Sequence, residues 1–139
     1  LIFDSFNLVG FATSLPLECC APELQKPFIE KEMEVHRYYF LADSFLMQSY
    51  RGRGLGHHLF DQRELYAKKL QRFHSTCFAS IERAASHPKH TEQEESLHNF
   101  WEKRGYTRNN QLHFYQLWKD IDSPIPSPKT FIFWTKHLP

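Results

Sequence analysis

Cysteine is scarce in this chain, and its distribution excludes two kinds of architecture. The three cysteines are Cys19, Cys20 and Cys77, and two of them are adjacent. An odd number with this spacing makes no disulfide framework, and without a C-x-x-C pair the usual zinc motif is missing. We therefore expect a protein of the reducing cytoplasm that binds no metal.

The chain also lacks an excess of charge of one sign and any long apolar run. Seventeen Lys and Arg residues face sixteen Asp and Glu residues, which gives a net charge of +1. A dedicated nucleic-acid binder would favour a basic excess that neutralises phosphates, so we expect no nucleic-acid partner. The apolar runs are too short to cross a bilayer, so we expect no membrane partner either.

What the chain does contain is material for one packed core. It has 139 residues, of which 41% are hydrophobic and 16% aromatic. This length is typical of a single domain, which we assign to residues 1–139. Because the sequence starts at Leu1, without Met and directly in strand-like residues, we expect further N-terminal residues in the native protein.

Alternating and aromatic-rich segments predict the strands. They are Leu1–Phe6, Leu8–Leu15, Arg37–Met47, His74–Ile81, Leu112–Ile121 and Phe131–Lys136, with a tight turn at Asn7. The segment Arg37–Met47 is mostly apolar, as expected for a strand that is buried on both faces. Cys19–Val35 holds two prolines, which predicts a loop with at most one helical turn.

Apolar residues at helical spacing predict two helices, His57–Leu70 and Glu92–Arg104. Gly105 follows the second helix, where a C-terminal cap belongs. The polar segment Glu82–Thr91 contains Pro88 and is expected to be a loop. Interleaved strands and helices predict an α/β or α+β protein with a mainly antiparallel sheet.

The segment S-Y-R-G-R-G-L-G-H-H at residues 49–58 lies between an expected strand and an expected helix. Glycine allows positive φ and close approach of a ligand, and a helix N-terminus presents free N–H groups. Arg51 and Arg53 add positive charge, so the segment predicts a phosphate site. The simpler alternative is a glycine-rich turn with solvated arginines, which the flanking strand and helix disfavour.

The glycine spacing separates three phosphate-binding patterns. The P-loop needs Gly-Lys-Ser/Thr, and the dinucleotide fingerprint needs G-x-G-x-x-G, whereas this chain has G-x-G-x-G. Residues 51–56 match the third pattern, [Q/R]-x-x-G-x-[G/A]. Residues 99–106, N-F-W-E-K-R-G-Y, are similar to L-Y-x-x-x-G-F. The chain thus resembles motifs A and B of the GNAT superfamily of acyl-CoA N-acyltransferases, over about residues 1–118.

This resemblance implies a GNAT-like sheet with flanking helices, from which the family's first strand and two helices are missing. It implies that the backbone of Ser44, Phe45 and Leu46 binds the pantetheine arm of acetyl-CoA. It also implies that a loop holds the pyrophosphate. The loop residues would be Arg51, Gly52, Arg53, Gly54, Leu55, Gly56 and His57.

The chain departs from the family pattern at the expected proton donor. Many members have a Tyr four residues before the motif B glycine, where it protonates the departing thiolate, and here that position is Trp101. Because indole is no acid, we expect Trp101 to be a core aromatic. Cys77 lies mid-strand and is also expected to be a core residue, which disfavours an acyl-cysteine mechanism.

Two carboxylates are candidates for the general base that the acceptor amine requires. Asp43 lies in an apolar strand, where burial would raise its pKa and suit it to act as a base. An aspartate that points to solvent at a strand bulge fits the sequence equally well. Glu82 is the second candidate base, and Arg83 could bind a substrate carboxylate, unless the two form a surface ion pair. His87 could line the acceptor pocket, although an exposed loop histidine is the simpler interpretation.

These observations predict a cytoplasmic N-acetyltransferase that moves an acetyl group from acetyl-CoA to a primary amine of a small molecule or peptide by direct attack. The alternative, which Trp101 motivates, is a non-catalytic CoA-binding or regulatory module. We expect the edge strand to be covered by further N-terminal residues or by a partner subunit, such as the second copy in a homodimer.

Overall fold

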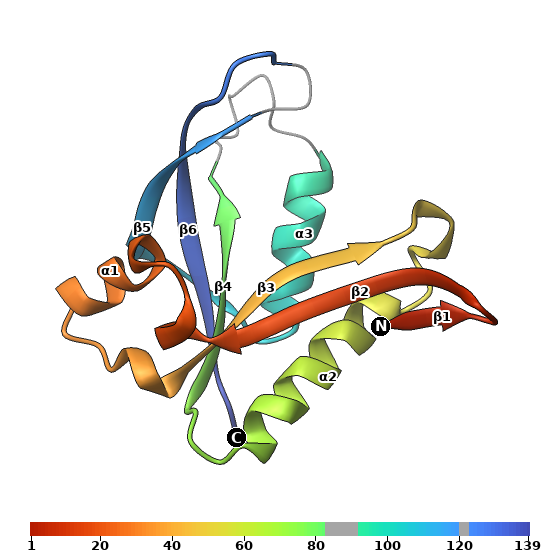
Figure 1. The fold of residues 1–139 in the computed structure, drawn as a ribbon, viewed down its shortest axis with the longest axis horizontal. Coiled ribbons are helices and arrows are strands. Elements are labelled where there is room, and N and C mark those ends of the chain that lie inside the picture. Colours follow the sequence, from red (N-terminus) through yellow and green to blue (C-terminus); the bar gives the residue numbers. More distant parts are fainter. Residues whose placement is uncertain (83–91, 120–122) are drawn as a thin grey trace.

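A computed structural model of the chain describes residues 1–82, 92–119 and 123–139 (Figure 1). The described part contains a six-stranded sheet in the order β1-β2-β3-β4-β6-β5. Its strands are β1 (Ile2–Asp4), β2 (Asn7–Pro16), β3 (Tyr38–Leu46), β4 (Ser75–Ile81), β5 (Thr107–Trp118) and β6 (Ser127–His137). Its helices are α1 (Pro22–Glu30), α2 (Leu55–Lys69) and α3 (Glu92–Lys103), with single 3-10 turns at Leu17–Cys19, Val35–Arg37 and Gln48–Tyr50. Only β3 and β4 pair in parallel, so the expected mainly antiparallel sheet is confirmed.

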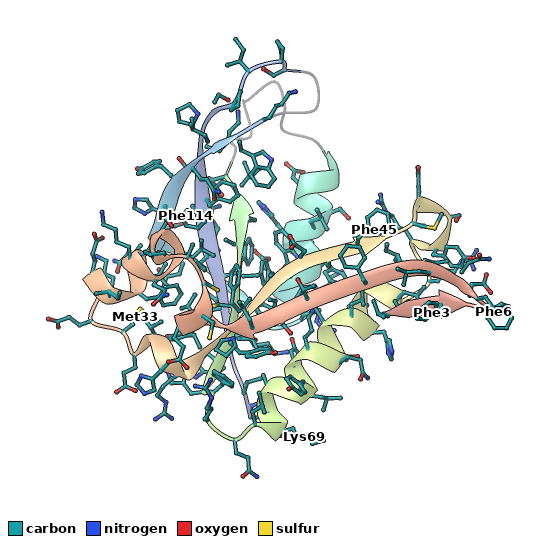
Figure 2. The ribbon with its side chains drawn as sticks, viewed as in Figure 1. Phe3, Phe6, Met33, Phe45, Lys69 and Phe114 are labelled. Atoms are coloured by element: carbon teal, nitrogen blue, oxygen red, sulfur yellow. The ribbon has the colours of Figure 1, made fainter. Side chains whose placement is uncertain are left out.

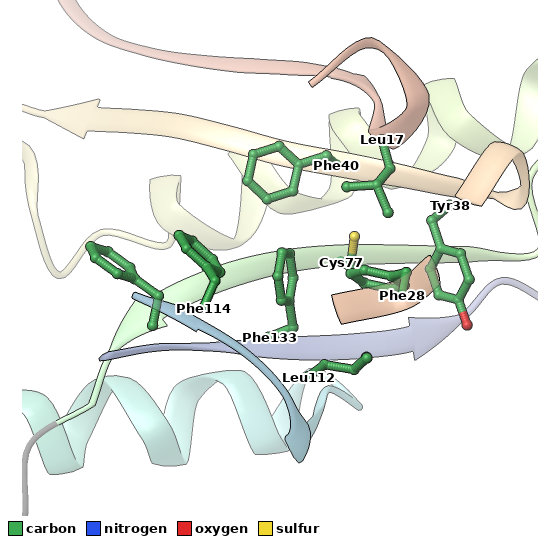
Figure 3. Packing of buried hydrophobic residues seen from close by; sticks show 9 residues of the cluster. Leu17, Phe28, Tyr38, Phe40, Cys77, Leu112, Phe114 and Phe133 are labelled. Atoms are coloured by element: carbon green, nitrogen blue, oxygen red, sulfur yellow. The ribbon is translucent and has the colours of Figure 1, made fainter. Parts of the chain in front are cut away.

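Two hydrophobic clusters cover the two faces of the sheet. Figure 3 shows the first cluster, in which Phe28 of α1 packs between the strand residues Tyr38 and Phe133. The second cluster joins Ala67 of α2 to the strand residues Leu41 and Phe78, with Phe60 and Trp101 packed against it. Neighbouring strand residues alternate between the clusters because successive side chains point to opposite faces. Helix α1 therefore covers one face, and α2 and α3 cover the other.

Strand β3 is buried on both faces only in its first half. Tyr38, Tyr39, Phe40 and Leu41 are buried, whereas Asp43, Ser44 and Phe45 are exposed. The parallel ladder to β4 covers only Tyr38–Phe40, and after it the two strands diverge, as Figure 1 shows. The expectation of burial along the whole strand is wrong for its second half, because none of the described strands pairs with that half on the β4 side.

Two segments near the N-terminus differ from the expectations. The turn between β1 and β2 lies at Ser5 and Phe6, with Ser5 at φ 56°, and Asn7 already belongs to β2. The segment Cys19–Val35 contains the nine-residue helix α1 and not merely a loop. Pro22 stands at the start of this helix, where a proline is tolerated, and Pro27 lies inside it. Burial of Pro27 and Phe28 against the sheet outweighs the poor helix propensity of proline.

The later elements follow the sequence patterns closely. The predicted strand His74–Ile81 is confirmed as β4, the two expected helices as α2 and α3, and Gly105 has the positive φ of a C-terminal cap, 96°. Strands β5 and β6 are longer than expected because they pair with each other over most of their length. Most of the expected loop Glu82–Thr91 and the end of the expected strand at Ile121 lie outside the described residues. None of the described helices is long and apolar enough to cross a membrane.

Candidate functional site

The glycine segment forms a tight turn that leads directly into α2. Gly52 and Gly54 have φ values of 76° and 81°, which residues with a Cβ rarely adopt. Gly54 is the N-cap of α2, and no described side chain caps the first turn. The N–H groups of Leu55, Gly56 and His57 therefore lack acceptors within the helix. A Cβ at Gly52 or Gly54 would meet no described atom within 4 Å, so a ligand can approach this backbone.

A cavity of about 930 Å³ is lined by this turn and by residues of the strands β3 and β4. Its walls come from β3, the glycine turn, α2, β4 and α3. The lining residues are Leu41, Ala42, Ser44, Phe45, Leu46, Arg51, Gly52, Gly54, Gly56, His57, Leu59, Phe60, Arg63, Phe78, Ala79, Ser96, Leu97, Phe100 and Trp101. This volume suits a ligand of the size of a drug or a cofactor arm.

The structure brings most of the predicted cofactor residues to one cavity. The lining includes all three predicted strand residues, Ser44, Phe45 and Leu46, and all but two of the predicted loop residues. The two exceptions are Arg53, which lies over the Tyr50 ring at 5.1 Å, and Leu55. Arg51 donates from Nε to the carbonyl of Leu46 at 3.0 Å, which ties the turn to the end of β3.

A β-bulge interrupts β3 beside this cavity. Ala12 of β2 pairs with Ser44 and Ser14 pairs with Leu41, so Ala42 and Asp43 together stand opposite Thr13. The backbone N–H of Asp43 donates to Thr13 Oγ1 at 3.0 Å. Bulges re-aim neighbouring side chains and backbone groups, and this one lies just beyond the end of the ladder between β3 and β4.

The two candidate bases lie outside the cavity lining. The Asp43 side chain is exposed and lies at a β-bulge, so of its two equal expectations the solvent-facing aspartate at a bulge is confirmed and the buried carboxylate is not. Glu82, just after β4, pairs with Arg108 through Oε1, while its Oε2 is buried and finds no partner among the described residues. Arg83 and His87, the predicted substrate-binding residues, lie outside the described residues.

His57 of the loop is held by two residues near the end of α3. Arg104 donates from Nη1 to His57 Nδ1 at 3.0 Å, and the Phe100 ring lies 4.4 Å from the imidazole. Arg104 also donates to Asp61 at 2.7 Å and to Glu64 at 3.0 Å. The hydrogen bond from Arg104 lowers the pKa of Asp61. An acceptor role for Nδ1 places the proton of a neutral His57 on Nε2.

Trp101 has the surroundings of a core aromatic, although one side of it lines the cavity. Its ring lies 4.8 Å from Phe78 and 5.1 Å from Trp134. The described lining contains no tyrosine. The buried Tyr106 lies outside it, with its hydroxyl between Thr76 and Glu64 at 2.9 Å each. Burial raises the pKa of Tyr106.

Cysteine and histidine add no metal site to the part of the chain that the structure describes. Its described residues contain no group of three or more His, Cys, Asp or Glu side chains that could hold an ion. Cys77 is completely buried, and desolvation raises the pKa of its thiol well above the ordinary value. A thiol that resists ionisation is a poor nucleophile.

The sequence patterns missed two polar residues of the cavity lining, Ser96 and the buried Arg63. Arg63 lies on α2 between Leu59 and Ala67 at helical spacing, and all three are buried. The helix was predicted from its apolar residues, and three of those (Leu65, Tyr66 and Leu70) are exposed. The sequence did contain a signal for this burial. Arg63 lies four residues after Leu59 and four residues before Ala67, so the three share one face of the helix.

Comparison with known proteins bears on the fold. No family model matches the chain, and no curated protein matches it in sequence. Among solved structures it is similar to the ribosomal-protein-S18-alanine N-acetyltransferase from Escherichia coli, with 12% identity, a TM-score of 0.59 and coverage of 98% of this chain and 65% of the other. It is also similar to a GNAT-family acetyltransferase from Staphylococcus aureus, with 15% identity, a TM-score of 0.55 and coverage of 99% and 65%.

A third similar structure is a complex. It is a proposed streptothricin acetyltransferase from Bacillus anthracis with acetyl coenzyme A, at 18% identity and a TM-score of 0.50, covering 74% of this chain and 50% of the other. The chain thus spans about two thirds, or less, of the length of these three structures. At these identities the similarity shows the fold: the chain has the fold of the GNAT acyl-CoA N-acyltransferases.

Proposed function

We propose that this chain is the catalytic part of an N-acetyltransferase that transfers an acetyl group from acetyl-CoA to a primary amine. One observation carries the proposal. In a GNAT fold, a single cavity joins the uncapped N-terminus of α2, the turn with Gly52 and Gly54, and the bulged strand β3. This arrangement has an anion site at one end and free strand backbone beside it, which suits a long ligand with a phosphate end.

The residues of the turn fit a pyrophosphate. The N–H groups of Leu55, Gly56 and His57 would donate to its oxygens, with the positive end of the helix dipole behind them. Arg51 adds positive charge at the rim of the turn. His57, with Nδ1 occupied by Arg104, can donate a further hydrogen bond from Nε2.

Along β3, the backbone of Ser44, Phe45 and Leu46 would bind the pantetheine arm. Bound acetyl-CoA supplies an acyl thioester: the amine nitrogen bonds to its carbonyl carbon, the C–S bond breaks, and the amine loses the proton that the thiol gains. Backbone N–H groups beside the bulge would polarise the carbonyl as an oxyanion site does. Much of the acceleration would come from positioning.

Asp43 or Glu82 would take the proton from the acceptor ammonium. Asp43 directly precedes the pantetheine-binding residues, and Glu82 follows the last residue of β4. The pH dependence of the transfer rate in Asp43→Asn and Glu82→Gln distinguishes them, because the true base contributes the acidic limb of the profile. An unchanged profile in both variants would exclude both carboxylates.

The second candidate is a CoA-binding module without turnover. The packing of Trp101 among Phe78 and Trp134, together with a described lining that contains no tyrosine, favours it. In this hypothesis the cavity binds CoA, and the protein acts as a sensor of the CoA concentration. Steady acetylation of any amine would exclude it.

Calorimetry with acetyl-CoA tests the proposal. We expect binding to the wild type, and at least tenfold weaker binding to Arg51→Glu, because this change places a negative charge beside the phosphates. Lys69→Ala is the matched control: Lys69 is an exposed cation at the far end of α2 (Figure 2), and its loss should leave binding unchanged. No binding at millimolar acetyl-CoA would refute the proposal. Release of CoA over a panel of amines then separates the enzyme from the module.

A further inference from the structure

Arg63 is a buried cation on the inward face of α2. Only 7% of its surface is exposed. Its neighbours along this face, Leu59 and Ala67, are the apolar residues that such a position normally holds. A buried arginine is usually paired with a carboxylate, because an unpaired buried charge is costly.

Arg63 has no such partner among the described residues. Its Nε donates to the carbonyl of Leu59 at 3.1 Å, and its Nη1 donates to the carbonyl of Thr13 at 3.4 Å. The Phe60 ring lies 5.0 Å from the guanidinium carbon. A guanidinium has five N–H donors, so donors on Nη1 and Nη2 are left over after these two bonds.

The neighbouring carboxylate, Glu64, is already engaged elsewhere. Its oxygens accept from Arg104 at 3.0 Å, from Lys136 at 3.2 and 3.3 Å, and from Tyr106 at 2.9 Å. Two cations thus share this one acid. Desolvation lowers the pKa of Arg63, and the negative charge of Glu64 offsets part of that effect without a hydrogen bond between the two side chains. Arg63 therefore lacks a carboxylate in direct contact among the described residues.

The side of Arg63 that is not packed lines the cavity. The lining also contains apolar residues of β3 and β4, namely Leu41, Ala42, Phe78 and Ala79. Arg63 lies seven residues beyond Gly56 on α2, which is about 10 Å along the helix axis. It is therefore well separated from the N–H groups at the N-terminus of α2 that fit the pyrophosphate.

We propose that Arg63 forms a carboxylate subsite in the interior of the cavity, so that one of the two substrates carries a carboxylate. This inference rests on the acyl-CoA binding and N-acyl transfer of the proposed function; if the acyl group carries the carboxylate, a dicarboxylic thioester takes the place of acetyl-CoA as the donor. A planar carboxylate accepts two parallel hydrogen bonds from a guanidinium and supplies the direct partner that Arg63 lacks among the described residues. It can come from the acyl group, as in the thioester of a dicarboxylic acid, or from an acceptor that is an amino acid. The shared chemistry is a carboxylate that meets a buried arginine.

The first experiment needs no variant. Succinyl-CoA and butyryl-CoA have acyl chains of four carbons, and only the first ends in a carboxylate. Calorimetry compares them for wild-type protein, and CoA release compares amino acids with their amides as acceptors. We expect at least a tenfold preference for the carboxylate in one of the two comparisons, and the comparison that shows it identifies the source.

The second experiment assigns the preference to Arg63. Arg63→Met should reduce it to less than about twofold, and Arg63→Lys should retain part of it. Arg72→Met is the matched control, because Arg72 is exposed and pairs with Glu18 away from the cavity. Circular dichroism and butyryl-CoA binding establish that each variant is folded. If Arg63→Met does not fold, the assignment rests on the preference measured for the wild type and on its partial loss in Arg63→Lys.

The outcomes separate this inference from the proposed function. If neutral acyl-CoAs bind but neither comparison shows a preference, or if the preference survives Arg63→Met, the carboxylate subsite is refuted and the acetyltransferase proposal stands. If no acyl-CoA binds, the proposed function fails and the subsite fails with it.

Discussion

His74 is a single residue whose surroundings make the stability of the fold depend on pH. Its imidazole lies between Tyr38, at a ring distance of 4.7 Å, and His137, at 5.6 Å, and Nδ1 is 2.7 Å from Ser75 Oγ. Desolvation lowers the pKa of His74, and the charges of Arg37 and His137 lower it further. The folded protein therefore favours the neutral ring.

We expect acidification to destabilise the protein through His74. The unfolded chain takes up this proton at its ordinary pKa of about 6.5, whereas the folded chain takes it up only at lower pH. Stability from this residue is thus complete above about pH 6.5 and declines as the pH falls below it. Urea denaturation of wild type and His74→Gln at pH 7.5 and 5.0 measures the effect.

The variant should lose less stability between these two pH values than the wild type does. His58→Gln replaces an exposed histidine of α2 and is the control for the loss of a histidine as such. If wild type and His74→Gln lose the same free energy of unfolding between pH 7.5 and pH 5.0, His74 is not the source of the pH dependence.

At the scale of elements, the junction of β3, the glycine turn and α2 depends on backbone conformation more than on side chains. Gly54 has a φ of 81° at the N-cap, whereas Gly56, two residues later, lies inside the helix without a positive φ. A Cβ at Gly56 would approach Phe100 Cζ at 3.7 Å, an ordinary contact. The two glycines should therefore respond differently to the same substitution.

We expect Gly54→Ala to destabilise the protein by roughly 1–2 kcal/mol, because an L-residue is strained in this region. Gly56→Ala, in the first turn of α2, should not destabilise the protein, because φ is not positive there, the added Cβ makes an ordinary contact and alanine has the better helix propensity. The free energy of unfolding in urea measures both. A similar effect of the two changes would mean that the turn is not held in the conformation described.

At the scale of the whole molecule, α1 packs into the core on one face of the sheet, whereas the tip of the β1–β2 hairpin lies outside the core. Phe28 is fully buried between Phe133 and Tyr38, at ring distances of 4.8 and 4.9 Å. Phe6 at the hairpin tip is fully exposed, and Figure 2 shows it pointing away from the rest of the molecule. The same residue type thus occurs in opposite surroundings.

We expect Phe28→Ala to cost about 3–5 kcal/mol, because it removes a large buried side chain and leaves a cavity. Phe6→Ala should change stability by less than about 0.5 kcal/mol. Thermal and urea unfolding of the two variants measure the difference. A large loss in Phe6→Ala would show that the hairpin tip is packed against something in solution.

Local patterns were sufficient for the order of the strands, for α2 and α3, and for the position of the glycine turn. The glycines at 52 and 54 are required where φ is positive, and that requirement is local to the chain. The Ser44–Leu46 segment directly precedes the turn, so its place beside the cavity follows from sequence proximity. Local patterns failed for α1, because the helix depends on burying Phe28 against strands far away in the sequence.

The sequence by itself determined the strand–turn–helix unit and the free helix N-terminus at its centre, where we propose the anion site, because glycine conformation, helix periodicity and the free N–H groups of a helix end are properties of short segments. The tertiary structure alone decided the bulge opposite Thr13, the exposure of Asp43 and the burial of Arg63 without a carboxylate. Each depends on contacts between residues that lie far apart in the sequence, such as Arg63 with Thr13 and Arg104 with His57. Such contacts form only when the elements pack.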